Sequence, residues 1–103
     1  MYKISFFVPV NYADIVKQAV FNVGAGSMGD YAECSWETLG TGQFKPLEGS
    51  NPFIGLPNKL ERVQELKVEM LCQENLIENA IKVLKLAHPY EEPAYDVVKL
   101  ECF

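Results

Sequence analysis

The chain has little positive charge and no long apolar run. Its 103 residues include 9 Lys and Arg against 14 Asp and Glu, a net charge of −5, and Arg62 is the one arginine. Binding to nucleic acid or to anionic membranes requires clustered positive charge, so we expect neither partner. No apolar stretch approaches the roughly 20 residues of a membrane-spanning helix. Pro9 also interrupts the apolar N-terminal segment too early for a signal peptide.

Cysteine and histidine are also scarce. Cys34, Cys72 and Cys102 are odd in number and form no Cys-x-x-Cys pair, and His88 is the one histidine. A secreted domain of this size would need an even number of cysteines for a disulfide framework. The pattern therefore favours reduced thiols in a cytoplasmic protein and argues against a cysteine-type zinc site.

The remaining composition is that of a folded domain. Hydrophobic residues make up 49% of the chain and charged residues 22%, as in globular proteins rather than disordered ones. At this length we expect residues 1–103 to form a single domain that buries enough surface for a core. An enzyme whose cleft lies between two lobes of this chain is excluded.

Hydrophobic spacing predicts a β-α-β-β-α-β order. Strands are expected at 2–9, 31–39, 61–72 and 94–101. Helical spacing runs from Ile15 to Val23, before Gly24, and over 75–87, where His88 and Pro89 end the helix. This order predicts an α+β, ferredoxin-like sandwich, in which two helices cover one face of a four-stranded antiparallel sheet.

Residues Gly40–Asn58 separate the second and third predicted strands. They include four glycines and three prolines, and they are too many for a tight turn. We expect a functional loop or an elongated hairpin arm. Large hydrophobic residues within it include Phe44, Phe53, Ile54 and Leu56. A solvated loop would not need them, so we expect the loop to pack against something, such as another subunit.

The second face of such a sheet has no helices to cover it. Phe7 and other apolar side chains would lie on this face and would be exposed to solvent in a small monomer. Self-association through the face or its edges would bury them. We therefore predict an oligomer, and cyclic trimers are a known solution for this architecture.

Residues 24–29 match the pattern Gly-x-Gly-x-x-Gly. A dinucleotide site needs this pattern between a strand and a following helix. Here the pattern follows a helix and precedes a strand, so the helix dipole points the wrong way for a phosphate. A helix cap followed by a turn is the simpler interpretation, although its backbone N–H groups could form a small anion nest.

The segment from His88 to Asp96 carries the one histidine, two adjacent carboxylates and two tyrosines between two prolines. One hypothesis is a divalent metal ion held by His88 with Glu91 or Glu92, completed by Glu65, Cys34 or a neighbouring subunit. The alternative, which we favour, is that His88 ends the helix and has a structural or interface role. A catalytic Cys34–His88 pair is a weaker hypothesis, because a cysteine within a strand is usually a small hydrophobic residue.

Five linked motifs resemble a known family. They are Gly24–Tyr31, Cys34–Trp36, Gly40–Pro46, Asn51–Gly55 and His88–Tyr95, in this order along nearly the whole chain. Together they resemble the inserted domain of the Nif-three-like (YqfO) family, here as a stand-alone version. The His-Pro-Tyr-x-x-Pro pattern of residues 88–93 is also similar to the CutA family. Asn58 stands where the family often has glycine.

The resemblance implies a fold shared with CutA and with the PII signalling proteins, and a homotrimer. The larger lobes of the Nif-three-like family carry a paired-metal centre and a metal-dependent hydrolase activity. This chain has one histidine and neither lobe, so that activity is not carried over.

We therefore expect a non-catalytic binding or regulatory module, with a small anion, a nucleotide or a divalent metal ion in a cleft between subunits. A protein-interaction or scaffold domain is the alternative, and an enzyme is a weaker one. The cleft would be lined by the long loop, the glycine turn and the 88–95 segment. Its candidate ligand-binding residues are Gly24, Gly26, Gly29, Tyr31, Cys34, Gly42, Phe44, Tyr90 and Tyr95, and its candidate metal ligands are His88, Glu91, Glu92 and Glu65.

Overall fold

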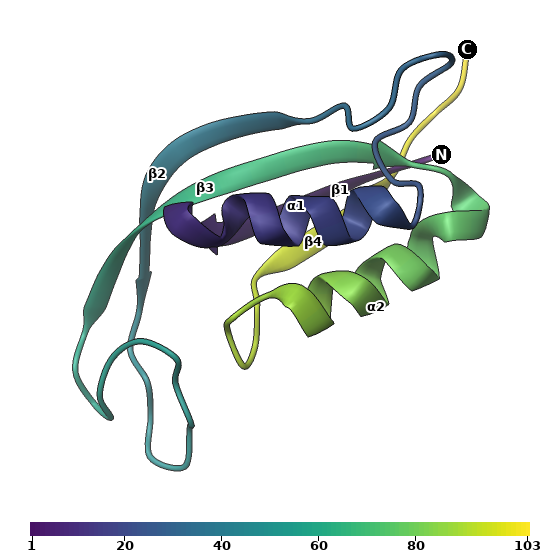
Figure 1. Ribbon diagram of the computed structural model, residues 1–103. Coiled ribbons are helices and arrows are strands. Elements are labelled where there is room, and N and C mark those ends of the chain that lie inside the picture. The colour runs from purple at the N-terminus through teal and green to yellow at the C-terminus, as the bar shows by residue number, and fades with distance from the viewer.

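Four antiparallel strands form one sheet. A computed structural model describes residues 1–103 (Figure 1). The strands are β1 (Tyr2–Pro9), β2 (Trp36–Phe44), β3 (Glu61–Cys72) and β4 (Tyr95–Lys99), and their order in the sheet is β2-β3-β1-β4. This order, with β1 central between β3 and β4, confirms the predicted ferredoxin-like topology.

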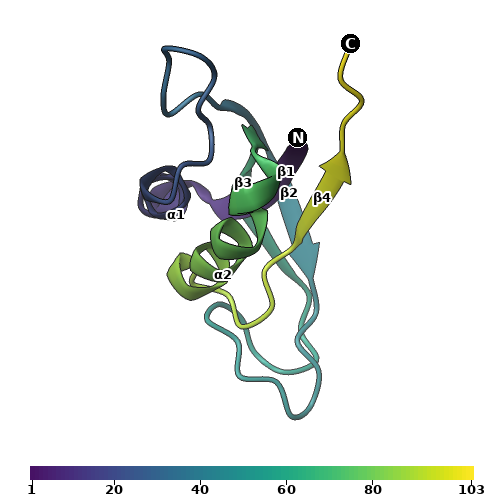
Figure 2. The ribbon, with the colours of Figure 1, turned by 90° about the vertical axis from the view of Figure 1, so that its right-hand side faces the viewer.

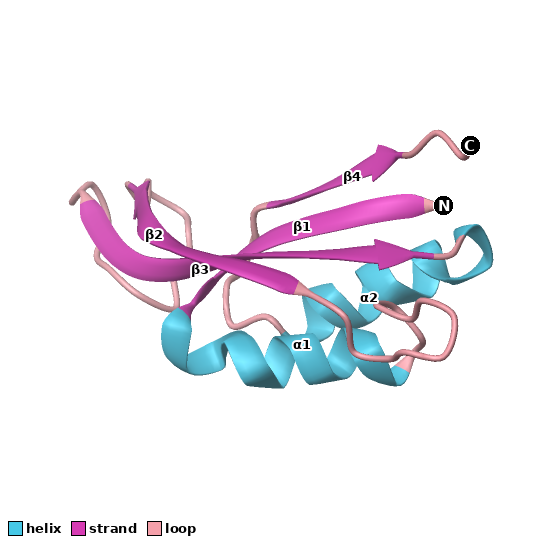
Figure 3. Cartoon of the chain, turned by 90° about the horizontal axis from the view of Figure 1, so that it is seen from above, coloured by secondary structure: helices cyan, strands magenta, loops and turns pink.

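Two helices pack side by side against one face of the sheet, as Figure 3 shows. They are α1 (Ala13–Asn22) and α2 (Ile77–Ala87), and each follows a short 3-10 turn, Val10–Tyr12 and Glu74–Leu76. Neither helix has the length and apolar character needed to cross a membrane. The predicted helices are confirmed with shifted bounds: the first runs from Ala13 to Asn22 instead of Ile15 to Val23, and the second begins at Ile77 instead of residue 75.

The core lies between the helices and the inner face of the sheet. Ile4, Phe6 and Val8 alternate along β1 and are fully buried, as a period of two residues requires. The other core residues are Val68, Met70 and Cys72 of β3, Ala13, Val16 and Val20 of α1, Ala80 and Leu84 of α2, and Ala25. Burying each large aliphatic or aromatic side chain contributes about 1.5–3 kcal/mol.

The second predicted strand, 31–39, is wrong in its position, because β2 begins at Trp36. The preceding residues are held in a compact turn instead: Met28 and Tyr31 exchange backbone hydrogen bonds, and Cys34 N donates to Gly26 O at 2.8 Å. Glu33 adopts a left-handed conformation at φ 57°, which a strand excludes.

The Gly40–Asn58 segment forms part of an elongated hairpin arm, one of the two forms expected for it. Residues 40–44 continue β2 and pair with 61–65 of β3, so the loop proper begins at Lys45. Cross-strand pairing overrides the low strand propensity of Gly40 and Gly42. We call residues 40–65 the arm; it projects past the N-terminal end of α1 (Figure 1) and extends below both helices in the view of Figure 2. Asn58 has φ 62°, a conformation that favours glycine.

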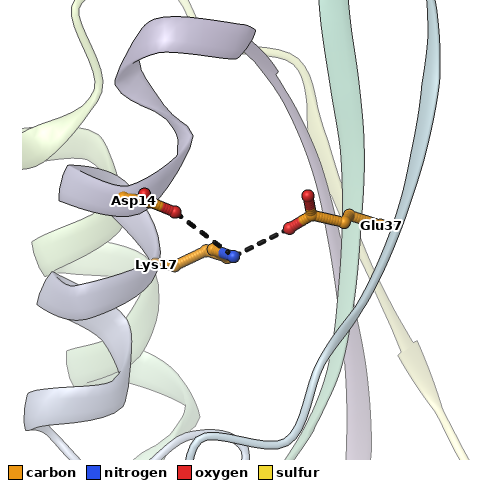
Figure 4. A network of polar contacts seen from close by, with 3 residues as sticks. All are labelled: Asp14, Lys17 and Glu37. Carbon is orange, nitrogen blue, oxygen red and sulfur yellow. Dashed lines mark hydrogen bonds and ion pairs between the residues drawn. The ribbon is translucent and has the colours of Figure 1, made fainter.

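An ion network fastens β2 to α1 (Figure 4). Lys17 Nζ lies 2.7 Å from Glu37 Oε1 and 3.5 Å from Asp14 Oδ1. The hydrogen bond to Glu37 raises the pKa of Lys17 above its usual value. The edge strand β2 therefore has a polar attachment to the helical layer.

Candidate functional site

The loop after α2 is fixed by the ring of His88. Nε2 lies 2.7 Å from Phe7 O on β1, and Nδ1 accepts a hydrogen bond from Tyr90 N at 3.0 Å. Because Nδ1 accepts, Nε2 carries the proton and donates to Phe7 O. The ring is buried, and burial lowers the pKa of His88 despite the opposing effects of Phe7 O and Glu65. A neutral histidine therefore ties residues 88–90 to β1, as the favoured structural interpretation predicts.

Tyr90 connects this loop to a buried carboxylate on β3. Its hydroxyl donates to Glu65 Oε2 at 2.9 Å, and its ring lies 5.7 Å from the ring of Phe44. Burial and the adjacent carboxylate raise the pKa of Tyr90 well above its usual value. Glu65 is only 8% exposed, and it has this position because Gly42 has no side chain beneath it.

The second oxygen of Glu65 has no protein partner. No hydrogen-bond donor meets Oε1, which lies 2.0 Å from the place a Cβ at residue 42 would occupy. Glu65 also forms no ion pair, although Lys3, Lys17 and Lys67 all do so with other carboxylates. Oε1 is nevertheless within reach of solvent, because the one fully buried side-chain oxygen without a partner is Oε2 of Glu61, also on β3.

A cavity of about 420 Å³ opens between the arm and the loop after α2. Its apolar walls include Phe7, Phe44, Pro46, Pro52, Phe53 and Ile54, and its polar groups include Lys45, Ser50, Glu65, Tyr90, Glu91 and Glu92. The volume is that of small-molecule pockets, and the combination of apolar walls with a few polar groups is typical of them.

Two further contacts hold the arm against the body of the domain. The backbone N–H of Asn51 donates to Glu91 Oε2 at 3.2 Å, and the ring of Phe53 meets that of Tyr12 edge-on at 5.4 Å. Phe44, Phe53 and Ile54 thus pack or line the cavity, as their place in the loop predicts, whereas Leu56 stays exposed. The roles of Asn51 and Tyr12 had no signal in the sequence, since one acts through its backbone and both depend on the bend of the arm.

The structure divides the predicted ligand-binding residues into two groups. Phe44 and Tyr90 line the cavity, and Gly42 lines a second, adjoining hollow that shares Glu65 with it. The turn that contains Gly24, Gly26, Gly29, Tyr31 and Cys34 is attached to the other end of β3, where Gly26 N donates to Leu71 O. Leu71 is six residues from Glu65, or about 20 Å along an extended strand. One chain therefore cannot bring both groups to one site, and a common cleft requires a second copy.

Tyr95 belongs to neither group. It begins β4 opposite Phe6, and Lys85 Nζ lies 5.3 Å from the centre of its ring. Its side chain packs against the core cluster. Its place in the structure is explained by packing.

The four predicted metal ligands do not form a metal site within one chain. Glu65, Glu91 and Glu92 line the cavity, and Tyr90 lies between Glu65 and His88. No three His, Cys, Asp or Glu side chains come together as a group that could hold a metal ion. A metal ion would also have to displace a hydrogen bond from the His88 ring. Metal binding stays a prediction that requires ligands from a second copy.

Cys34 and His88 are not neighbours. Cys34 Sγ lies 3.8 Å from Ala32 O within its own turn, and His88 is bonded to β1 and to Tyr90. All three cysteines are free thiols. The chain therefore holds no Cys–His pair that could act as nucleophile and base.

Nearly the whole chain is similar to a segment of longer known proteins. No family model matches it. A curated relative from Halalkalibacterium halodurans, a GTP cyclohydrolase 1 type 2 homolog, is 45% identical over 100 residues, which cover 97% of this chain and 27% of the relative. A Bacillus cereus protein related to NIF3 is 40% identical with a TM-score of 0.83, covering 98% of this chain and 26% of that one.

Two more distant structures share the fold. CutA1 from Pyrococcus horikoshii has a TM-score of 0.71 at 18% identity, covering 100% of this chain and 86% of its own. The PII-like protein CutA from Nostoc has a TM-score of 0.68 at 15% identity, covering 98% of this chain and 82% of its own. At these identities the likeness concerns the fold alone.

The chain thus has the α+β fold that CutA and PII-like proteins share. By sequence the chain is similar to one segment of longer proteins related to NIF3, in agreement with the resemblance that its five motifs indicate. It spans about a quarter of the length of the curated relatives it matches.

Proposed function

We propose that this domain is a non-catalytic, self-associating module that binds a small molecule in the cavity between the arm and the loop after α2. The cavity itself is the observation that supports the proposal. It combines about 420 Å³ with apolar walls and a few fixed polar groups, which is what a small-molecule site needs. A regulatory role follows if the bound molecule changes how the arm meets a partner.

The one histidine is not available as a general base at the cavity. A general base needs a free ring nitrogen or carboxylate aimed at a substrate and held there. Both nitrogens of His88 are engaged in holding the backbone. The GTP cyclohydrolase name describes proteins of which this chain spans about a quarter, so their activity is not part of the proposal.

Self-association is supported by the apolar residues that one chain leaves exposed. Trp36 and Leu39 on the edge strand β2, and Val97 and Val98 on the edge strand β4, are exposed. Edge strands also carry backbone groups that a second copy can pair with. We propose a homotrimer, in which the turn around Gly26 of one copy could approach the cavity of the next.

A protein-interaction role is the second candidate, and the tip of the arm favours it. Leu47, Leu56 and Leu60 are each more than half exposed there. An exposed apolar tip is typical of a docking surface. This role would use the arm without requiring a ligand in the cavity.

Native mass spectrometry of untagged protein, purified gently without chelator, tests the assembly. We expect the mass of three chains, and a Trp36→Glu variant should shift the population to monomer. Ile15→Glu is the matched control, because Ile15 is comparably exposed but lies on α1. A wild-type monomer would contradict the proposed assembly. A reproducible extra mass on the trimer would identify a ligand by its weight.

Two-dimensional NMR with a small-molecule fragment set tests the binding site. Fragments that bind should shift the backbone amides of Phe44, Ser50 and Glu91, which line the cavity. The amides of Glu78 and Lys82, which are exposed on α2, serve as the internal control. If no fragment shifts the cavity amides, the proposed site is wrong, and the interaction role becomes the better account.

A further inference from the structure

The cavity has an unbalanced charge. Three carboxylates line it, those of Glu65, Glu91 and Glu92, and Lys45 is its one cationic residue. Lys45 forms no ion pair with any of the three. An anionic ligand such as a phosphate or a nucleotide would therefore enter a site of its own sign, which is unfavourable. This disfavours the anion and nucleotide ligands considered from the sequence.

Glu65 differs from the two other carboxylates. Glu91 and Glu92 are exposed to water, whereas Glu65 is more than nine-tenths buried. Tyr90 donates to Oε2, whereas Oε1 has no protein donor and lies beside Gly42, which lines an adjoining hollow. A carboxylate that is largely removed from water gains from a cationic partner, so a cation that enters the cavity would supply Glu65 with an interaction that the protein does not provide.

The form of the cation follows from the walls. A divalent metal ion needs several converging ligands, and the cavity gathers no such group. A single carboxylate that the protein leaves without a cation instead matches one ammonium or guanidinium group, which donates hydrogen bonds to it. The rings of Phe7, Phe44 and Phe53 would then cover an apolar body, and aromatic faces also attract cations.

We infer that the cavity binds a small organic cation, in which an apolar body lies against the aromatic wall and an ammonium or guanidinium group pairs with Glu65. The inference rests on the proposed small-molecule site and gives the chemical class of its ligand. It also explains why an acidic residue occupies a buried position that no protein cation reaches.

Three probes of one shape test the charge class: 2-phenylethylammonium, the neutral 2-phenylethanol and the anion phenylacetate. Binding is measured by calorimetry and by NMR shifts of the Phe44 and Ser50 amides. We expect the ammonium compound to bind at least about tenfold more tightly than the alcohol, and phenylacetate to bind more weakly than either. Equal binding of the ammonium compound and the alcohol would overturn the inference.

A Glu65→Gln variant tests the residue. The amide keeps the size and an acceptor for Tyr90 but removes the charge, so we expect about a tenfold loss for the ammonium probe and less than a twofold change for the alcohol. Glu101→Gln, the same charge change in the exposed C-terminal segment, should alter neither. Unchanged ammonium affinity in a folded Glu65→Gln variant would refute the role of Glu65, and if that variant fails to fold, the three-probe comparison on wild type decides.

The outcomes separate the two proposals. If the alcohol or phenylacetate shifts the cavity amides with no preference for the ammonium compound, the cavity is a ligand site but the cation is wrong. If neither these probes nor the fragment set shifts the amides, the proposed small-molecule site fails as well.

Discussion

Replacing Gly42 by alanine places a methyl group where the Glu65 carboxylate now lies. A Cβ at residue 42 would be 2.0 Å from Glu65 Oε1 and 2.5 Å from Glu65 Cδ, and atoms do not approach so closely. Gly42 does not have a positive φ, so its backbone accepts alanine without strain. The collision with Glu65 is therefore the one structural obstacle, and the flexible carboxylate must move away.

The cost follows from what Glu65 loses. Its hydrogen bond from Tyr90, at 2.9 Å, has a charged acceptor, and such bonds contribute about 1.5–3 kcal/mol. Alanine in place of glycine restricts the unfolded chain, which offsets about 0.4–1 kcal/mol. We expect Gly42→Ala to lower the free energy of unfolding by about 1–2 kcal/mol. Each kcal/mol lowers Tm by about 4–8 °C in a domain of this size.

Urea unfolding followed by circular dichroism measures this difference. Gly40→Ala is the matched control, because Gly40 lies on the same strand, has no positive φ and has nothing within 4 Å of an added Cβ. That variant should be as stable as wild type or slightly more stable. In a Glu65→Ala background no carboxylate collides with the added methyl group, so Gly42→Ala should lower the free energy of unfolding no more than Gly40→Ala does. Equal stability of Gly42→Ala and Gly40→Ala in the wild-type background would refute the placement of Glu65 over Gly42.

Three further predictions concern hydrogen bonds and charges. Tyr90→Phe leaves Glu65 Oε2 without its donor and should lower the free energy of unfolding by about 1–3 kcal/mol, as measured with urea at pH 7. Because folding raises the pKa of Tyr90, wild type should also lose stability as pH rises above about 10, and the variant should lose less. The pKa of His88 is lowered by burial, so the unfolded chain takes up its proton first, and stability should fall as pH drops below about 6.5 until the folded pKa is reached. NMR titration of His88 should give a midpoint below pH 6.5. A midpoint above pH 6.5 would contradict a neutral ring held by two hydrogen bonds. Glu37→Gln removes the charge that pairs with Lys17 and should lower the free energy of unfolding by less than about 1 kcal/mol. The difference between variant and wild type should shrink in 1 M salt. A larger loss that does not depend on salt would show that Glu37 acts through packing instead.

The strands and helices with regular periodicity were predictable from the sequence. Ile4, Phe6 and Val8 show the period of a strand with one buried face, and all three are in the core. The strand at 61–72 has the predicted bounds. These elements could be predicted because each buries one face against a single layer, so the local pattern carries the full signal.

The start of β2 was not predictable in the same way. Residues 31–35 have the composition of a strand, but Cys34 is hydrogen-bonded to Gly26 and Glu33 is left-handed. Gly40 and Gly42, which suggest a loop, pair with β3 instead. Partners distant in sequence decide these conformations, and a local pattern does not record them.

For the candidate site, the sequence by itself determined which residues are unusual. The one histidine, the prolines on either side of Tyr90 and the hydrophobic residues of the long loop all marked segments that the cavity uses. It could not determine that Gly26 and Gly42 lie at opposite ends of β3, because spacing in sequence does not fix distance across a sheet.

Only the tertiary structure decided that Glu65 is buried without a cation, that Tyr90 joins it to His88, and that the arm closes a cavity over it. Along β3, Glu65 follows the alternation of a residue on the wet face of its strand. Its burial comes from Tyr90 and Phe44, which the chain brings from 25 residues later and 21 residues earlier. Long-range packing sets the environment of a charge, and the sequence states only that the charge is there.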